Sequence, residues 1–528
     1  MVSTPSKSGE NQAQSLFNES LRAKTTKDYP HALKFFQQAL HAAPQKFLSP
    51  DSWAAIFNPP EWFSGDDEAG QYLDYAYGVM DELLSLCTDQ PDLSQKLALA
   101  FIGKSHFRQT TQNYRNLGPL MSHRAAIFKL ALSALEPLMS YEFPTPVSAG
   151  KKIRYGIILK HLMQDPETIG ALSYFEFAHA PDIEVIVFVS SDATQPGFVE
   201  RVSAVSNQII ALPAALPSAI ETLRKADLDI LFYANDVTAK PSLPSLLTFF
   251  RVARRTFTCV STIATTQAPF VDAYMGGKYF HDMGYVGEFS ERFIPLPFPG
   301  FSFSIPVTTK VNDADFDLSK FGIPAKVLVL ASGANHNKIS GPLLKSWAAI
   351  LKQLDQAYLL LYPFPPHYGT AQIALVKHWY QLLANEGISA ERVKILPSLG
   401  SREAVIALLR GADIGLDSFP YSGLTTIVDA MEASLPIIVP SGPMLRNNHG
   451  AAILDNVGAP ELIAKSEEDY VRLAVELGLD ACKRAELRSR IAGAMNPRPG
   501  FLDPSSYCKE VIKACRILYE EMLASGKT

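Results

Sequence analysis

The sequence predicts an α/β protein in which two Rossmann-like domains face a cleft and an all-α N-terminal domain precedes them. Two observations favour this fold. Short apolar runs separated by helix-length segments fill residues 149–528 in two series, a pattern typical of parallel sheets built from βαβ units. Residues 15–142 instead show helical periodicity throughout. At 528 residues the chain is long enough for two or three domains with buried cores.

The N-terminal region begins with the polar stretch MVSTPSKSGENQAQ, so we expect residues 1–14 to form a disordered tail. An all-α domain is predicted over residues 15–148, and its start follows a tetratricopeptide-like helix pattern. The pattern consists of Tyr29, Ala32, Phe36, Ala39, Leu40 and Pro44. One such unit cannot bury its own apolar face, so it should pack against the helices that follow. A plain helical domain is the alternative.

A Pro-rich break, YEFPTPVSAGKK, precedes the first Rossmann-like domain, predicted over residues 149–310. Its expected strands are the runs IRYGIILK, IEVIVFVSS, LDILFYAN, RTFTCVS and ERFIPLP. The second Rossmann-like domain is predicted over residues 311–528, with strands KVLVLASG, AYLLLYPF, RVKILPS, ADIGLD and PIIVP. No GxGxxG follows the first strand and no GxxxxGK[ST] occurs, so dinucleotide and P-loop sites are poorly supported.

Composition argues against several classes of protein. Hydrophobic residues make up 47% of the chain, charged residues 19%, and the formal net charge is −5. No long basic run occurs, so nucleic-acid binding is not expected. The five cysteines lack CxxC or Cys/His spacing, which argues against a disulfide framework and a zinc site. Because no apolar run approaches about 18 residues and no apolar signal core is found, we expect a soluble cytoplasmic protein without a membrane segment.

A loop at residues 418–426, SFPYSGLTT, follows the predicted strand ADIGLD and opens a predicted helix. One interpretation is structural: Thr425 or Thr426 caps the helix, and with Thr426 as N-cap Asp429 completes a capping box. The other interpretation is a ligand site, because ligands of open α/β sheets bind at the carboxyl ends of strands. Free N–H groups and two hydroxyls there suit a phosphate, and Asp429 would be free to hold ribose hydroxyls.

A second loop, ASGANHNKISGPLL, follows the first strand of the same predicted domain and carries Asn335 and Lys338. A lysine at a strand exit is often only solvated. Here, however, both loops should open on the same carboxyl edge of the sheet and meet at one ligand. A cation and a helix N-terminus suit a diphosphate leaving group, because fixed donors then neutralise its developing charge without a metal.

The C-terminal half resembles a known family. The stretch LDSFPYSGLTTIVDAMEASLPIIVPSG and the downstream segments GAPELIA and EDYVRLA are similar to the donor-binding region of one glycosyltransferase family. That family contains the protein O-GlcNAc transferases and the bacterial cytoplasmic adhesin-type N-glycosyltransferases. The resemblance implies a GT-B fold and inverting transfer of GlcNAc or glucose from a UDP-sugar to Ser/Thr or Asn of a protein acceptor. No DxD follows a predicted strand, so metal-dependent transfer is disfavoured, and no cofactor besides the UDP-sugar is expected.

The resemblance also implies roles for single residues. Lys338 would neutralise the leaving diphosphate, which Thr425 and Thr426 would contact. Asp429 would hold the ribose. A segment that begins at Ser398 would hold uracil through its backbone. The predicted donor site comprises Asn335, Lys338, Ser398, Leu399, Ser422, Gly423, Thr425, Thr426 and Asp429, and no metal ligand is predicted.

The acceptor side matches the family less well. Residues 262–264, Thr-Ile-Ala, stand where family members carry Gly-His-Pro, and Leu424 replaces a histidine of the O-GlcNAc branch. The general base is therefore sought in the first loop of the first Rossmann-like domain, LKHLMQDPETIGAL. There His161 and Asp165 join Lys338 as the candidate catalytic residues.

Two classes of function stay open. The first is a glycosyltransferase whose N-terminal helices help to bind the protein acceptor. These helices also offer a surface for a partner protein or for self-association. The second is a catalytically degenerate relative that serves as a nucleotide-sugar-binding or protein-interaction module. The enzyme is favoured because the donor residues, Lys338 among them, are retained. A UDP-sugar epimerase is disfavoured, because no persuasive pair of carboxylates is found.

Overall fold

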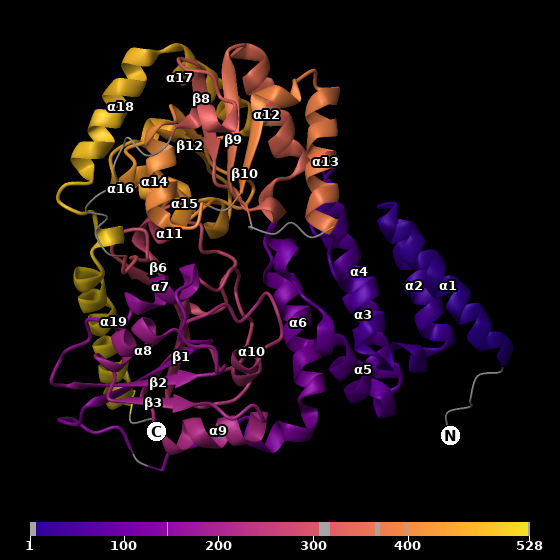
Figure 1. The fold of residues 1–528 in the computed structure, drawn as a ribbon. Coiled ribbons are helices and arrows are strands. Elements are labelled where there is room, and N and C mark those ends of the chain that lie inside the picture. The colour runs from indigo at the N-terminus through magenta and orange to yellow at the C-terminus, as the bar shows by residue number, and fades with distance from the viewer. Residues whose placement is uncertain (1–6, 145, 306–316, 365–369, 398, 526–528) are drawn as a thin grey trace.

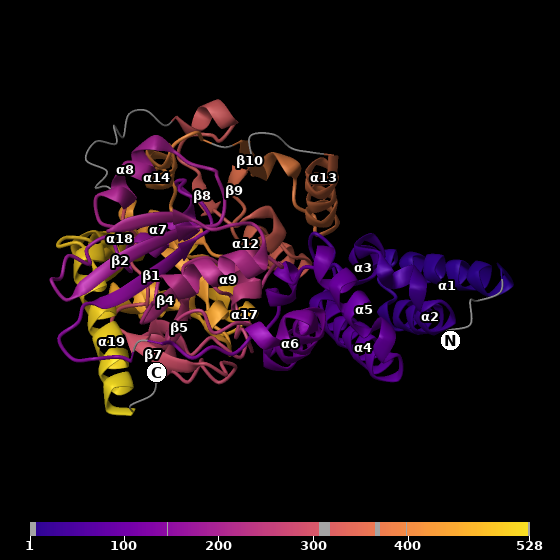
Figure 2. The same ribbon diagram turned by 90° about the horizontal axis from the view of Figure 1, so that it is seen from below.

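The structure is a computed structural model that describes residues 7–144, 146–305, 317–364, 370–397 and 399–525. A helical domain is followed by two domains that are each built around a parallel sheet (Figure 1). The helical domain projects to one side of the paired sheet domains, and its first two helices lie farthest from them (Figure 2). Within the described ranges, no helix has the length and apolar character needed to cross a membrane.

The helical domain starts with a hairpin of α1 (Lys7–Thr25) and α2 (Tyr29–Ala42). All five α2 residues of the predicted tetratricopeptide-like pattern are buried, as that pattern requires. Residues 7–14, expected in a disordered tail, instead form the first turns of α1, whereas residues 1–6 lie outside the described ranges. The domain continues with α3 (Pro50–Phe57), α4 (Glu68–Asp89), α5 (Pro91–Lys104) and α6 (Gly118–Ala131), and with the 3-10 turns η1 (Pro44–Leu48), η2 (Arg108–Thr111) and η3 (Ser133–Leu138).

The first sheet domain has the strand order β3-β2-β1-β4-β5-β6-β7, and every neighbouring pair is parallel. Strands β1 (Ile153–Leu159) and β2 (Ile183–Val189) are buried along almost their whole length, as in a sheet covered on both faces. The other strands are β3 (Gln208–Ala211), β4 (Ile230–Tyr233), β5 (Arg255–Cys259), β6 (Ala273–Gly277) and β7 (Arg292–Leu296). The helices are α7 (Pro166–Leu172), α8 (Pro196–Ser203), α9 (Leu216–Lys225), α10 (Leu243–Leu247) and α11 (Lys278–Asp282).

The second sheet domain has the order β10-β9-β8-β11-β12-β13, again with parallel neighbours. Its strands are β8 (Leu328–Ser332), β9 (Ala357–Phe364), β10 (Val393–Pro397), β11 (Ile414–Leu416), β12 (Ile437–Pro440) and β13 (Ile463–Ala464). Its helices are α12 (Gly341–Gln353), α13 (Thr370–Asn385), α14 (Arg402–Arg410), α15 (Thr425–Glu432), α16 (His449–Asn456), α17 (Glu467–Leu479) and α18 (Ala481–Ala494).

The last helix, α19 (Pro504–Ser525), leaves the second sheet domain and lies alongside the first (Figure 1). Its apolar face shares the core of the first sheet, and Tyr507 Oη lies 2.9 Å from Tyr174 Oη and donates to the carbonyl oxygen of Gly300 at 2.7 Å. The predicted C-terminal domain of residues 311–528 is therefore one helix too long.

Both sheets reverse their strand order at a single point, between β1 and β4 in the first and between β8 and β11 in the second. Ligands of such sheets bind beyond the carboxyl ends of the two strands that flank the reversal. The loops that follow these four strands are therefore the expected position of a site.

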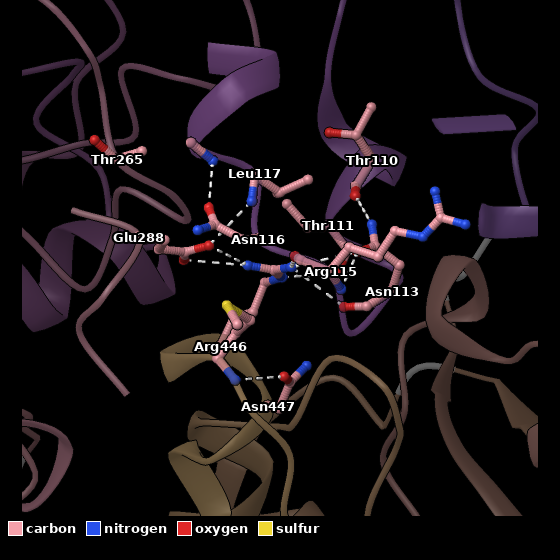
Figure 3. Close-up of polar contacts among 12 residues, drawn as sticks. Thr110, Thr111, Asn113, Arg115, Asn116, Leu117, Thr265, Glu288, Arg446 and Asn447 are labelled. Carbon is pink, nitrogen blue, oxygen red and sulfur yellow. Dashed lines mark hydrogen bonds and ion pairs between the residues drawn. The ribbon is translucent and has the colours of Figure 1, made fainter. Parts of the chain in front are cut away.

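A buried ion pair joins all three domains (Figure 3). Arg446, in the loop after β12, pairs with Glu288 of the first sheet domain at 2.9 Å, and neither side chain is accessible to solvent. The Arg446 guanidinium also donates to backbone oxygens of Thr111 (3.2 Å) and Asn113 (3.3 Å) in the helical domain. A buried charge is stable only when it is paired, and the partners of Arg446 come from the other two domains. The junction therefore holds the three domains in one arrangement.

Candidate functional site

A cavity of about 610 Å³ lies at the carboxyl ends of the two sheets. Its walls come from the segments that follow β1, β4 and β5 of the first sheet and β8 and β11 of the second. The 3-10 turn η2 of the helical domain supplies another part of the wall. All three domains therefore line one cavity, which includes both points of strand reversal.

The loop after β8 carries Asn335 and Lys338, and both residues line the cavity. Asn335 caps the 3-10 turn η6 (His336–Lys338), because its side chain accepts a hydrogen bond from the Asn337 N–H. The cap fixes the direction in which the turn leaves the strand. Lys338 therefore occupies the cavity wall that the sequence predicted for it.

The ammonium group of Lys338 is held by the loop that follows β11. Its Nζ donates to the carbonyl oxygen of Ser422 at 3.0 Å and lies 4.0 Å from the centre of the Tyr421 ring. Burial lowers the pKa of Lys338 to about 8, and the nearby charge of Asp417 opposes this shift. A cation removed from water in this way interacts strongly with an anion that enters the cavity.

The loop after β11 is organised by the buried carboxylate of Asp417. It accepts hydrogen bonds from Ser422 Oγ (2.6 Å) and the Gly423 N–H (2.9 Å). Ser422, predicted to bind the donor, is fully buried inside this network. A Cβ at Gly423 would lie 2.7 Å from Asp417 Oδ1 and 2.5 Å from Thr426 Oγ1, so any other residue would force one of these side chains to shift.

Helix α15 begins at the cavity without a side-chain cap. Its N-cap residue is Leu424, and no side chain of the described residues bonds to its first N–H groups. The predicted capping box of Thr426 and Asp429 is therefore wrong, because Thr426 is the second residue of the helix. Thr425 and Thr426 line the cavity, so two hydroxyls and the positive end of the helix dipole face it.

Asp429 forms an ion pair with Arg402 at 2.7 Å, and Arg402 also pairs with Glu432. Burial raises the pKa of Asp429 to about 6, although the charge of Arg402 opposes this shift. Neither Asp429 nor Leu399 is among the residues that line the cavity, and Leu399 packs against the apolar core of the domain. Ser398 lies outside the described residues.

The two candidate bases of the first sheet domain contact each other. Asp165 caps α7 by accepting hydrogen bonds from the Thr168 N–H and Oγ1, each at 2.9 Å. Its Oδ2 also lies 3.0 Å from His161 Nε2. Neither residue is among those that line the cavity, but Glu167, in the first turn of the same helix, does line it.

Glu167 and Asp236 are carboxylates of the cavity wall that the sequence reasoning missed. Burial raises the pKa of both groups. Asn235 Nδ2 donates to Glu167 at 3.1 Å, and Asp236 accepts from the N–H and hydroxyl of Thr238. Their positions just beyond β1 and β4 were the signal that could have found them, because those strands flank the reversal of the first sheet.

The apolar replacements noted in the sequence also face this cavity. Ile263 and Leu424 both line it, at the two positions where the resembling family carries histidine. The cavity wall therefore combines the cation of Lys338 and the start of α15 from the second sheet domain with the carboxylates of Glu167 and Asp236 from the first.

Residues 314–511 match the model of the family described as Glycosyl transferase family 41. This range contains the loop of Lys338, the loop after β11 and helix α15. The match confirms, for this part of the chain, the resemblance seen in the sequence.

Curated relatives of the chain are much longer proteins. A probable UDP-N-acetylglucosamine–peptide N-acetylglucosaminyltransferase SPINDLY of Eustoma exaltatum subsp. russellianum is 31% identical over 172 residues, which cover 33% of this chain and 18% of that protein. The UDP-N-acetylglucosamine–peptide N-acetylglucosaminyltransferase of Caenorhabditis elegans is 25% identical over 193 residues, covering 37% and 16%. The matched part spans less than one fifth of the length of each relative.

Similarity of fold extends over the whole chain. The structure of a mutant O-GlcNAc transferase of Thermobaculum terrenum superposes with a TM-score of 0.65 at 18% identity, covering 99% of this chain and all of that one. The predicted fold, two facing Rossmann-like domains of GT-B type preceded by an all-α domain, is thereby confirmed.

Proposed function

We propose that the protein is an inverting, metal-independent glycosyltransferase that moves GlcNAc or glucose from a UDP-sugar to a Ser/Thr or Asn side chain of a protein. One observation carries the proposal: the buried ammonium of Lys338 and the uncapped start of α15 face the same cavity at the strand reversal of the second sheet. The similarity to named peptide N-acetylglucosaminyltransferases supports the same reaction class. The five cysteines are unpaired, which favours a reducing compartment such as the cytoplasm.

In the donor half, the bond between the sugar C1 and the diphosphate oxygen breaks while the acceptor atom bonds to C1 from the opposite face. The diphosphate gains negative charge as it leaves. Lys338 and the N–H groups at the start of α15 stabilise that charge, with the hydroxyls of Thr425 and Thr426 beside them. The ion pair of Asp429 with Arg402 opens when the ribose hydroxyls bind to the carboxylate.

In the acceptor half, the attacking group must lose a proton, and the loop and first turn after β1 supply the base. Glu167 is the group of this segment that lines the cavity. His161 and Asp165 support it, because their contact and the Asp165 cap hold the first turn of α7, where Glu167 lies. We therefore assign proton transfer to Glu167 and positioning to His161 and Asp165.

A catalytically degenerate, nucleotide-sugar-binding protein is the second candidate function. The observation that favours it is that two apolar side chains, Ile263 of the first sheet domain and Leu424 of the second, line the cavity where the resembling family carries histidine. Such a protein would bind UDP-sugars through Lys338 and α15 without transferring the sugar.

A panel of UDP-sugars separates the two functions. We expect calorimetry to detect UDP binding, and we expect Asp429→Ala to weaken it by roughly 1.5–3 kcal/mol, because the ribose loses a charged acceptor. Intact-mass analysis of co-expressed proteins should then reveal added hexose or N-acetylhexosamine, with a turnover that EDTA leaves unchanged. Binding without transfer from any donor would establish the degenerate function, and activity that manganese restores after EDTA would contradict the role of Lys338.

A further inference from the structure

The helical domain places a free cation in the cavity. Arg108, the first residue of η2, lines the cavity together with Thr111 and Gln112 of the same segment. Its side chain is exposed, and across the described residues it has neither an ion pair nor a side-chain hydrogen bond. A guanidinium beside a substrate cavity that is not committed to a partner within the protein is available to a ligand.

The segment that follows Arg108, from Thr110 to Leu117, is fixed in position (Figure 3). Arg446 of the second sheet domain donates to the carbonyl oxygens of Thr111 and Asn113, three and five residues further along the chain. Glu288 of the first sheet domain accepts from the Leu117 N–H at 3.3 Å. Both sheet domains thus hold this segment of the helical domain, and the Arg108 backbone cannot move away from the cavity without breaking the buried junction.

Two further cations lie beside the same wall. Lys160 directly follows β1, and Lys240 follows Ala239, a lining residue beyond β4. Both lysines are exposed, and no ion pair joins either of them to another described residue. Burial lowers the pKa of Lys240, and the charges of Arg108 and Lys160 lie close enough to add to this lowering. The three residues therefore form one group, which we call the basic rim.

The carboxylates that face the basic rim do not neutralise it by direct contact. Asp236 accepts hydrogen bonds from Thr238 and from the Ala239 N–H, and Glu167 accepts one from Asn235. No oxygen of Asp236 or Glu167 lies within ion-pair distance of a cation among the described residues. The protein as a whole carries a net charge of −5, so this group of cations, which forms no direct ion pair with the described residues, is a local feature.

We propose that the basic rim binds an acidic segment of the acceptor protein, so that the preferred acceptor Ser, Thr or Asn has Asp or Glu close to it in sequence. This inference rests on the proposed function. Lys338 and the start of α15, both in the second sheet domain, are the groups assigned to the donor diphosphate, which leaves the rim of the other two domains to the acceptor. Complementary charge raises the affinity for an acidic segment, and repulsion disfavours a basic one.

Labelled acceptor peptides test the inference by binding and by transfer. Three sets carry the same acceptor residue flanked by Glu, by Gln or by Lys. We expect the Glu set to bind at least tenfold more tightly than the Lys set by fluorescence anisotropy, with a difference that shrinks as salt rises. Arg108→Gln should reduce the ratio of the affinity for the Glu peptides to that for the Lys peptides severalfold. Arg108→Glu should bring this affinity ratio close to one or invert it. Lys34→Glu makes the same charge change on an exposed, unpaired residue of α2 and should leave the ratio unchanged.

The results separate the inference from the proposed function. Equal binding and equal transfer of the three peptide sets would overturn the inference and leave the glycosyltransferase intact. Selective, Arg108-dependent binding of the Glu peptides without transfer from any UDP-sugar would overturn the glycosyltransferase but support the acidic ligand. If a single-stranded oligonucleotide bound more tightly than the Glu peptides and lost affinity in Arg108→Glu, the assignment to an acidic protein segment would be wrong.

Discussion

Two residues of the donor half titrate near neutral pH and set a window for donor binding. Burial raises the pKa of Asp429 to about 6, so its carboxylate is charged, and accepts from ribose hydroxyls, only above that pH. Burial lowers the pKa of Lys338 to about 8, so the cation that attracts the diphosphate is lost above that pH. We expect UDP-sugar affinity to be highest between these values and to fall by up to about tenfold per pH unit on either side.

Calorimetry with an intact UDP-sugar measures this window, because the terminal phosphate of UDP itself titrates near pH 6. Asp429→Asn should remove the decrease in UDP-sugar affinity at acidic pH, and Lys338→Met should remove the decrease at alkaline pH. His449 does not confuse the assignment, since burial and the charge of Lys338 lower its pKa to about 3 and keep it neutral throughout. An acidic limb that persists in Asp429→Asn would show that another group controls it.

Glu167 is expected to carry proton transfer on the acceptor side. Glu167→Gln keeps the shape of the side chain and an oxygen that can accept from Asn235, but it cannot take a proton, so kcat for protein glycosylation should fall about 10²- to 10⁴-fold. Because burial raises the pKa of Glu167, the wild-type kcat/KM should also decrease as the pH falls towards that pKa.

The neighbouring pair provides the comparison for Glu167. Asp165→Ala removes the side-chain cap of α7, which typically contributes about 0.5–2 kcal/mol, and His161→Ala removes the ring that contacts Asp165. Both variants should therefore be less stable than the wild type but lose less than Glu167→Gln in kcat. Single-turnover transfer and thermal unfolding measure both effects. Wild-type transfer by Glu167→Gln together with slow transfer by His161→Ala would return the role of base to His161.

At the scale of elements, the turn into α15 depends on one glycine. In Gly423→Ala the new methyl group would lie 2.5 Å from Thr426 Oγ1, so the start of α15 or the Asp417 network must shift. We expect UDP affinity to fall at least tenfold, because the helix N-terminus and Lys338 then no longer converge on the diphosphate. Gly493→Ala on α18 has open space around the new Cβ and should bind UDP normally. Equal UDP affinities for the two variants would mean that the loop adapts.

Most strands that the sequence predicted, such as β1 and β2, carry buried apolar runs, whereas the predicted strand β7 has one buried residue. Three others were missed for local reasons. Strand β3 is an edge strand without a buried residue, β6 ends in two glycines, and β13 has only two residues. The domain assignment of α19 failed for a different reason, because nothing in an amphipathic helix specifies which of two sheets it will cover.

The candidate site shows the same division between local and distant information. The positions of Lys338, Thr425 and Thr426 at the cavity were predictable because each residue lies shortly after a buried strand of the second sheet. The Thr426 capping box was wrong because sequence spacing cannot tell a cap from the first turn of a helix. Arg108 was missed because only tertiary packing brings the helical domain to the cavity.

At the scale of the whole molecule, the helical domain is a wall of the site and a structural partner of both sheet domains. Arg446 donates to three of its backbone carbonyl oxygens, those of Thr111, Asn113 and Arg115. Removal of residues 1–142 would leave the buried guanidinium without these acceptors. Such a truncation is therefore expected to lower the stability of the second sheet domain and to weaken UDP binding, in addition to removing acceptor contacts.

The junction itself provides the sharpest test of this view. Arg446→Met leaves Glu288 buried without its cation, and breaking a buried ion pair typically costs about 3–5 kcal/mol. We expect a clear decrease in the urea midpoint of unfolding, measured by tryptophan fluorescence, and faster proteolysis of residues 105–117.

Lys345→Met is the matched control. This variant breaks the ion pair between Lys345 and Asp66, which also joins the helical domain to the second sheet domain. Because both side chains are more than half exposed, the loss of stability should stay below about 1 kcal/mol. The double variant Arg446→Met, Glu288→Met should recover part of the stability, because it removes the stranded carboxylate. If Arg446→Met were no more harmful than Lys345→Met, the three domains would be held together by their apolar contacts, and the buried pair would contribute little to their arrangement.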